Sequence, residues 1–316
     1  MFKHHTLNGV YLLMRNSLYC IVMLMFFAAG CRRDKQNGPV PLNGTLTVNG
    51  IQRTYQVYVP PSANVSTTLP LLFVFHGGGG GGSASVVPLG FNALADRDQF
   101  IVVYPDAYND NWNDGRNATC IDQSQDDVAY VNALIDAVSQ HYSINTSKVF
   151  ACGVSNGGIF CHYLAAKLST RIKGIAAVIA SIAEPVYPGF SVSSPVSAML
   201  INGTDDPGVL YNGGAIFGIP CRGRVVGAEA TVNKWIAVTN CNTTPVVTAI
   251  PDRVPTDGCT ATQYVYAGGT AGAKVTFIKI QGGGHTWPGT GGGTGTGNVC
   301  QDFSATQYVW DFFKQM

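Results

Sequence analysis

The residues Gly153-Val154-Ser155-Asn156-Gly157 form a Gly-x-Ser-x-Gly motif between an apolar run and a stretch with helical periodicity. A serine on a sharp strand-to-helix turn projects its hydroxyl above the sheet, where it can act as a nucleophile. The two glycines are needed because side chains there would collide with the neighbouring elements. An ordinary turn with a capping serine has the same pattern, so Ser155 needs a partner base to be a candidate nucleophile.

His285 is the strongest candidate for that base. It lies late in the chain, in KVTFIKIQGGGHTWPG, directly after a predicted strand. Two other histidines precede the expected mature chain, two lie on predicted helices away from the turn, and one belongs to a glycine-rich loop. These five are His4, His5, His141, His162 and His76. Elimination and position therefore pair His285 with Ser155 as general base.

The acid that orients the histidine is expected between Ser155 and His285, because strand–turn–helix serine hydrolases have the order Ser, Asp or Glu, His. The sequence AMLINGTDDPGV places Asp205 and Asp206 at the carboxyl end of a predicted strand, where the sites of α/β sheets collect. Either aspartate could instead cap a turn. Glu184, after the preceding strand, is a further alternative.

The stretch FVFHGGGGGGS, residues 73–83, ends an apolar run in six consecutive glycines. A phosphate-binding loop would continue with Gly-Lys-Ser/Thr, and a linker would not follow a buried strand inside one domain. Exposed backbone N–H groups suit a third role, because the tetrahedral intermediate of acyl transfer needs two donors for its oxyanion. We expect these donors at Gly78, with Gly79 as the alternative, and at Asn156. His76 is then expected to brace the loop.

Two tryptophans could form a platform for an aromatic, sugar or polyester group: Trp287, two residues after His285, and Trp112. Each could equally be a packed core residue. No metal site is expected, because the chain has no Cys-x-x-Cys or His-x-x-x-His pair, and DNWNDG carries Trp112 where a calcium loop needs an oxygen ligand. No cofactor is expected either, since a serine nucleophile with a base needs none.

The strands and helices that must position these residues alternate along the chain. Two β-type runs flank Asn49-Gly50, a strong hairpin signal, and five continuous apolar runs are typical of strands buried on both faces. These five runs are residues 69–75, 100–106, 148–155, 174–181 and 196–203. Helices are predicted at residues 91–97, 127–142, 156–168, 228–239 and 305–314, with Ser124 and Ser304 as start signals of the second and last. The alternation predicts one α/β domain with a mostly parallel, doubly wound sheet and helices on both faces.

The first thirty residues do not belong to that domain. Arg15, the apolar run of residues 18–29 and the sequence Ala-Ala-Gly-Cys predict a signal peptide of the bacterial lipoprotein type over residues 1–30. Cys31 would then be the acylated mature N-terminus, followed by a tether over residues 31–41 and the catalytic domain over residues 42–316. Plain secretion, with Cys31 in a disulfide, is the alternative. In either case the domain is exported, and it meets a membrane only through the lipid.

Composition and cysteine content limit the classes of partner and the cellular compartment that we expect for this protein. Charged residues make up 12% of the chain and the formal net charge is +1, which argues against a nucleic-acid partner, whose backbone is met by clustered basic surface. Export permits disulfide bonds. Cys241 and Cys259 flank one loop-like excursion and are the first expected pair.

Six stretches, HGGGG, NWNDGR, DDVAYVNALID, GVSNGG, NGTDDP and GGGHTWPG, occur in the order found in secreted polyhydroxybutyrate depolymerases and feruloyl or acetylxylan esterases. The chain resembles this family from about residue 42 to about residue 313. The resemblance implies the α/β-hydrolase fold and esterase activity. The family usually reads His-Gly-Thr-Ala-Asp-Pro at the acid, which aligns its aspartate with Asp206. Here Asn202 and Asp205 stand where the family has histidine and alanine.

The resulting expectation is an exported serine esterase that hydrolyses esters of a polymer, either a polyhydroxybutyrate-type polyester or the feruloyl or acetyl esters of plant polysaccharide. Ser155 attacks the carbonyl, His285 takes its proton and Asp206 orients His285, while the N–H groups of Gly78 and Asn156 hold the oxyanion. Two alternatives stay open: a serine peptidase of the same fold, and a surface lipoprotein that binds polymer without catalysis.

Overall fold

The computed structural model describes residues 43–63, 67–79, 82–289 and 295–316. The signal peptide and tether predicted over residues 1–41, Cys31 included, lie outside the described residues. Within the described part of the chain, no helix has both the length and the apolar composition that crossing a bilayer requires.

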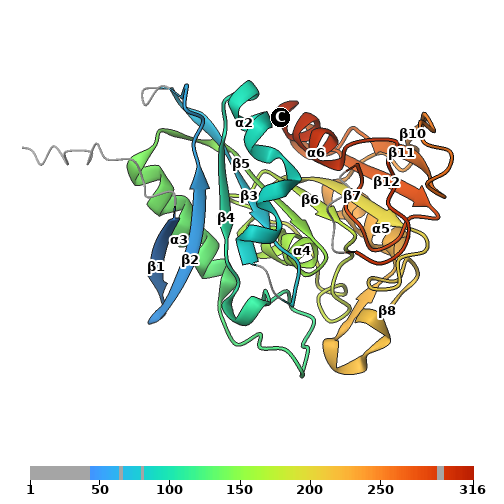
Figure 1. Ribbon diagram of the computed structural model, residues 1–316, viewed down its shortest axis with the longest axis horizontal. Helices are drawn as coiled ribbons and strands as arrows, with labels where there is room; N and C mark the ends of the chain where they lie inside the picture. The colour runs from blue at the N-terminus through green and yellow to red at the C-terminus, as the bar shows by residue number, and fades with distance from the viewer. Residues whose placement is uncertain (1–42, 64–66, 80–81, 290–294) are drawn as a thin grey trace, which may run out of the picture. The chain divides into compact units, whose positions relative to one another are not determined.

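A ten-stranded sheet runs through the described residues in the order β1-β2-β4-β3-β5-β6-β7-β12-β11-β10 (Figure 1). Six parallel strands form its centre: β4 (Ile101–Pro105), β3 (Leu69–Phe75), β5 (Ile144–Val154), β6 (Gly174–Val178), β7 (Ser197–Gly203) and β12 (Val275–Gln281). Antiparallel pairs close both edges, β1 (Asn43–Val48) with β2 (Ile51–Tyr58) and β10 (Val246–Ile250) with β11 (Thr260–Tyr266). The predicted turn between β1 and β2 is confirmed, since Asn49 and Gly50 both have positive φ.

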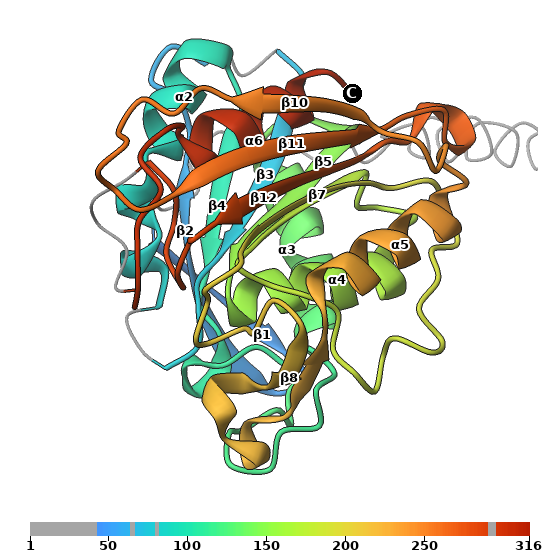
Figure 2. The ribbon, with the colours of Figure 1, turned by 90° about the vertical axis from the view of Figure 1, so that its right-hand side faces the viewer.

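Helices cover both faces of the sheet (Figure 2). One face carries α3 (Asp127–His141), α4 (Asn156–Leu168) and α5 (Ala228–Thr239), and the other carries α2 (Phe91–Asp98) and α6 (Ala305–Lys314). A separate hydrophobic core lies on each side, because the buried side chains of the central strands point alternately to the two helical layers. The predicted doubly wound, mostly parallel sheet is therefore confirmed.

A small antiparallel hairpin, β8 (Gly213–Ala215) with β9 (Arg224–Val226), stands outside the main sheet, and Gly213 pairs with Val226 at its base. Short 3₁₀ turns complete the described structure: η1 (Gly82–Ser85), η2 (Val87–Leu89), η3 (Tyr108–Asp110), η4 (Ile216–Gly218), η5 (Pro220–Arg222) and η6 (Thr270–Gly272). Two of these, η4 and η5, form the tip of the β8–β9 hairpin.

The helix-start predictions have different outcomes. Ser304 caps α6, because its hydroxyl accepts the backbone N–H of Gln307 at 3.3 Å. The prediction of Ser124 as the start of α3 is wrong. Asp126 is the cap, since its carboxylate accepts the N–H of Ala129 at 2.9 Å, while Ser124 donates to Asp122 instead. The helix begins at residue 127, so the residue directly before it has the N-cap geometry.

The order of the strands explains where a site can form. Strand β3 pairs with β4 on one side and with β5 on the other, so the chain changes direction across the sheet between them. Crevices at such switch points, outside the carboxyl ends of parallel strands, are the usual ligand sites of open α/β sheets. Phe75 pairs with Gly153, and the glycine loop after β3 therefore lies beside the Gly-x-Ser-x-Gly turn after β5.

A disulfide joins Cys120 to Cys221, which are 101 residues apart. The predicted Cys241–Cys259 pair is wrong, because both side chains are buried free thiols. Cys241 follows α5 and packs in the core beneath α3, α4 and α5, whereas Cys259 packs in the core on the opposite face of the sheet. The sheet itself separates the two thiols.

Candidate active site

Ser155 lies on a strained turn between β5 and α4. Its backbone has φ 52° and ψ −119°, a conformation that a residue with a side chain rarely adopts. A Cβ on Gly153 would overlap the backbone of Gly157, and one on Gly157 would overlap the carbonyl groups of Phe75 and His76. Both glycines of the motif are therefore required by close backbone packing, as the sequence predicts.

Three side chains from three strand ends meet in a chain of hydrogen bonds. His285 Nε2 lies 3.0 Å from Ser155 Oγ, and His285 Nδ1 lies 2.9 Å from both carboxylate oxygens of Asp206. Oδ1 of Asp206 also accepts the N–H groups of Gly208 and Val209, at 2.7 and 2.8 Å. These acceptor contacts favour a proton on Nδ1, so that Nε2 is free to accept the serine proton.

The two alternative acids lie elsewhere. Asp205 is exposed and accepts a hydrogen bond from the Thr204 hydroxyl at 2.8 Å. Glu184 forms an exposed ion pair with Arg224 at 2.5 Å. Of the three acids considered from the sequence, the structure brings only Asp206 to His285.

His285 is fixed by the segment that follows it. Its N–H donates to the carbonyl of Thr296 at 2.8 Å, and the N–H of Gly284 donates to Asn298 at 3.0 Å. A Cβ on Gly295 would overlap the carbonyl of His285, so this glycine lets the two segments lie against each other. The described end of the glycine-rich tract thus holds the histidine loop in place.

The glycine loop lies against the start of α4. A Cβ on Gly78 would lie 2.6 Å from the side-chain oxygen of Asn111 and 3.3 Å from Cβ of Asn156, so a larger residue here would have to displace the Asn111 side chain. Asn156 is the first residue of α4, where a backbone N–H has no partner within the helix. The alternative donor Gly79 is already engaged, because its N–H donates to the carbonyl of Asp110 at 3.1 Å. The geometry therefore favours Gly78 over Gly79.

His76 is completely buried at the base of the loop. Nε2 accepts the N–H of Ala107 at 3.0 Å, and Nδ1 lies 2.7 Å from the carbonyl of Gly77. Burial lowers the pKa of His76, so the ring is neutral and its Nδ1–H donates to Gly77. This arrangement agrees with the predicted bracing role.

Trp112 supports the site from below, and the prediction of a substrate platform at this residue is wrong. Its side chain has no exposed surface. The indole N–H donates to the carbonyl of His76 at 3.0 Å, and the backbone N–H donates to Oδ1 of Asn156 at 2.8 Å. Edge-on contact with Phe75 and stacking on Phe160 complete its packing, so Trp112 joins the glycine loop to α4.

Asn156, Asp114 and Arg116 continue this support as a buried polar chain. Asn156 donates to Oδ2 of Asp114 at 2.6 Å, and Arg116 pairs with the same carboxylate at 2.8 Å. Gln123 donates to Oδ1 of Asp114 at 2.9 Å. The stretch NWNDGR thus orients Asn156, the residue after Ser155, a role that its residue types alone do not reveal.

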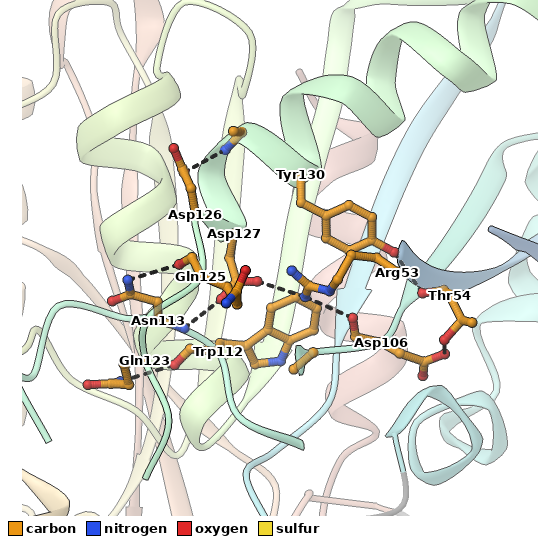
Figure 3. A network of polar contacts seen from close by, with 12 residues as sticks. Arg53, Thr54, Asp106, Trp112, Asn113, Gln123, Gln125, Asp126, Asp127 and Tyr130 are labelled. Carbon is orange, nitrogen blue, oxygen red and sulfur yellow. Dashed lines mark hydrogen bonds and ion pairs between the residues drawn. The ribbon is translucent and has the colours of Figure 1, made fainter. Parts of the chain in front are cut away.

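A second buried pair, Arg53 and Asp127, lies next to Trp112 (Figure 3). Nη2 of Arg53 lies 2.7 Å from Asp127 and donates to the carbonyl of Asp106 at 3.0 Å. The guanidinium carbon lies 4.2 Å from the ring centroid of Tyr130, and Oδ2 of Asp127 accepts the N–H of Asn113 at 2.6 Å. Arg53 and Asp127 therefore fix both ends of the loop that carries Trp112.

Trp287 lines a cavity of about 340 Å³ that opens over Ser155 and His285. The rest of this large cavity is mainly apolar and includes Val86, Pro88, Leu89, Val154 and Ile179. Trp287 itself is only 2% exposed, and its indole N–H donates to the hydroxyl of Thr306 at 3.1 Å. It can therefore form part of the cavity wall but offers little free ring surface as a platform.

One group among the described residues has the donor types of a metal site: Asp257, Cys300 and Asp302. Both oxygens of Asp257 already accept backbone N–H groups, from Cys259 at 2.8 Å and Gln301 at 2.7 Å. Oδ1 of Asp302 accepts the N–H of Arg253 at 2.7 Å. These carboxylates serve as turn-forming acceptors.

Comparison with known proteins connects this geometry to a family. The family model described as "Esterase PHB depolymerase" matches residues 53–214, just over half of the chain. "Putative esterase NocK" of Nocardia uniformis subsp. tsuyamanensis is 27% identical over 256 residues, which cover 77% of this chain and 73% of that protein. The bifunctional acetylxylan esterase/xylanase XynS20E of Neocallimastix patriciarum is 24% identical over 277 residues; these are 87% of this chain but only 35% of that protein.

Among solved structures, the acetyl xylan esterase from Aspergillus awamori aligns with a TM-score of 0.58 at 15% identity, over 87% of this chain and 99% of that chain. This likeness confirms the α/β-hydrolase fold. The matched family model shows that the chain belongs to the esterase family of the polyhydroxybutyrate depolymerases, a family of carboxylic ester hydrolases.

Proposed function

We propose that this protein is an exported serine esterase that uses Ser155, His285 and Asp206 as its catalytic triad. The observation that carries the proposal is the unbroken hydrogen-bond chain from the Ser155 hydroxyl through His285 to the buried Asp206. The strained backbone at Ser155 and the bare glycine loop beside it support the same role.

The reaction follows from the positions of these groups. His285 Nε2 takes the proton of Ser155 Oγ as the oxygen attacks the ester carbonyl, and Asp206 stabilises the imidazolium that forms. The oxyanion is stabilised by the N–H groups of Gly78 and Asn156. His285 then gives its proton to the leaving alcohol. Water, activated in the same way, releases the acid from the acyl-enzyme.

The substrate class is proposed from the family and from the large cavity. Relatives carry the names acetylxylan esterase, feruloyl esterase and polyhydroxybutyrate depolymerase, all of which act on esters of polymers or their fragments. A cavity of about 340 Å³ that is lined by apolar side chains together with polar surface suits an aromatic or alkyl ester group. We therefore propose a polymeric or oligomeric ester as the substrate.

Export to an oxidising compartment is proposed from the first thirty residues and is supported by the Cys120–Cys221 disulfide. Acylation of Cys31 would tether the enzyme to a membrane through a short polar segment. Globomycin treatment of expressing cells tests this step. Accumulation of the uncleaved precursor supports acylation at Cys31, and unchanged processing contradicts it.

The activity test compares methyl ferulate, a 3-hydroxybutyrate oligomer and acetylated xylan, with Ser155→Ala as the matched variant. We expect hydrolysis of at least one ester by the wild type and a loss of about 10⁴-fold or more in the variant. Labelling of Ser155 by a fluorophosphonate reports the nucleophile independently of the substrate. Substantial activity in Ser155→Ala would contradict the triad, and an unlabelled, inactive wild type would favour the polymer-binding alternative.

A further inference from the structure

A second, smaller cavity of about 100 Å³ adjoins Ser155 on the side of Gly78 and Asn156. It shares Gly78, Ser155 and Phe217 with the large cavity, but His285 lines only the large one. The charged side chains that line the small cavity are both cationic, Arg116 and Arg222, and no carboxylate lines it. The charged side chains that line the small cavity beside Ser155 are therefore of one sign.

The two arginines differ in how their charges are balanced. Arg116 is buried and paired with Asp114, so its charge is neutralised within the fold. Arg222 is exposed, and among the described residues no carboxylate lies within ion-pair distance of it. Its guanidinium carbon instead lies 5.6 Å from the ring centroid of Phe217. The Arg222 guanidinium therefore has no anionic partner within the part of the chain that the structure describes.

The backbone around Arg222 is firmly placed. Cys221, directly before it, is bonded to Cys120, and the carbonyl of Cys221 accepts the N–H groups of Thr119 and Cys120 at 2.7 and 3.2 Å. Ile121, directly after Cys120, lines the same small cavity. The disulfide thus holds two walls of the small cavity together and presents the base of the Arg222 side chain to it.

The face of Phe217 restricts where this guanidinium can go. Phe217 makes an edge contact with the ring of His285, with centroids 5.3 Å apart, and it lines both cavities. A guanidinium stacked on an aromatic ring keeps its in-plane N–H donors available for a second partner. Arg222 is therefore oriented beside Ser155, and its side-chain N–H groups donate to no other described residue.

We propose that the small cavity is a subsite for a carboxylate carried by the ester substrate, with Arg222 as its counter-ion. The proposal rests on the esterase function proposed above and specifies its substrate as an ester that bears a negative charge a few bonds from the scissile carbonyl. A carboxylate matches the planar fork of the guanidinium and can accept two N–H groups from it. The charge can belong to the acyl half or to the alcohol half of the ester.

The test uses two pairs of esters that differ only in charge. Monoethyl succinate and ethyl succinamate carry the carboxylate or its neutral amide on the acyl half, and 3-acetoxybutanoate and 3-acetoxybutanamide carry it on the alcohol half. For each pair, kcat/KM of the anionic ester is divided by kcat/KM of the neutral one. We expect the wild type to favour the anionic ester in one pair, and that pair identifies the half of the substrate that enters the small cavity.

The variants are Arg222→Gln, Arg222→Lys and the matched control Arg224→Gln. Arg224 lies two residues further along the same hairpin but is paired with Glu184, away from the small cavity. We expect Arg222→Gln to lower the anionic-to-neutral ratio by roughly tenfold. Arg222→Lys should lower the ratio less, and Arg224→Gln should leave it unchanged.

Two results would overturn the carboxylate subsite. In the first, the active wild type shows no preference for the anionic ester in either pair. In the second, Arg222→Gln lowers kcat/KM equally for both esters of a pair. Failure of the esterase proposal looks different. In that case the wild type hydrolyses no ester and Ser155 is not labelled by a fluorophosphonate, whatever residue stands at position 222.

Discussion

The two walls of the site are built in opposite ways. The inner wall, formed by Trp112, Asp114, Arg116 and Asn156, is buried, and its polar groups are paired with one another. The outer wall is the hairpin of residues 213–226, which is largely exposed. Phe217 is 41% exposed, and the guanidinium of Arg222 lies over its ring. The inner wall orients Asn156, one of the two proposed oxyanion donors, and such donors must be placed to within a fraction of an ångström. The outer wall lines both cavities through Phe217, where unpaired groups could select among ligands.

The largest expected effect comes from removing Asp127, which supports the inner wall by holding Asn113 and Arg53. Asp127→Ala leaves Arg53 as a buried charge without a partner, which we expect to cost about 4 kcal/mol of the free energy of unfolding. The matched control is Glu184→Gln, which breaks the exposed pair with Arg224 and should cost less than about 1 kcal/mol. Urea unfolding followed by tryptophan fluorescence measures both, and similar losses in the two variants would contradict the distinction between the walls.

The disulfide between the walls should have the next largest effect. Replacing both Cys120 and Cys221 by serine removes a cross-link between residues 101 positions apart. We expect this to lower the free energy of unfolding by about 3 kcal/mol. Reductant should lower the thermal midpoint of the wild type toward that of the double variant. The double variant should not respond to reductant, and a clear response would mean that another disulfide contributes.

The third prediction concerns His162, which lies behind the inner wall on α4 and accepts the indole N–H of Trp235 through Nδ1 at 3.0 Å. Burial lowers the pKa of His162 to about 3. The unfolded chain, with a histidine pKa near 6.5, therefore takes up a proton first as the pH falls, and stability is lost between about pH 6.5 and about pH 3.

At pH 5 this loss amounts to about 2 kcal/mol relative to pH 7. His162→Gln keeps an acceptor for Trp235 but removes the titration, so its stability should depend less on pH over this range. His141→Gln, at the exposed end of α3, is the control and should keep the wild-type dependence. Identical pH profiles for wild type and His162→Gln would show that the buried ring does not titrate as expected.

The smallest effect on stability, but a clear one on selectivity, is expected at the outer wall. Phe217→Ala should change the free energy of unfolding by less than about 1 kcal/mol, because the ring is exposed. It should alter the ratio of kcat/KM between a bulky and a small ester by several-fold, since Phe217 lines both cavities. An unchanged ratio would mean that the hairpin does not contact the substrate.

The sequence predicts the parts of this site that follow from local pattern. The turn around Ser155 is readable because strand, glycines and helix are contiguous, and the helix over residues 228–239 is found with its observed bounds. His285 follows from elimination, and Asp206 from the family resemblance.

The support of the site is not readable, because its partners lie far apart in the chain. Arg53 and Asp127 are separated by 74 positions, and neither residue type indicates that its charge is buried. From the sequence, Trp112 could be either a substrate platform or a packed core residue, because nothing local shows that its side chain is completely buried. The Cys120–Cys221 bond depends on the hairpin folding back over the site, which only the tertiary structure establishes.

The pairing of Gly213 with Val226 brings the two ends of the outer hairpin together at its base. A segment whose entry and exit points are neighbours can be lengthened, shortened or exchanged without moving the strands that carry Ser155, Asp206 and His285. The match to the family model ends at residue 214, just as this hairpin begins. We therefore expect that grafting this hairpin from one esterase to another can change the ester preference while the positions of Ser155, Asp206 and His285 stay the same.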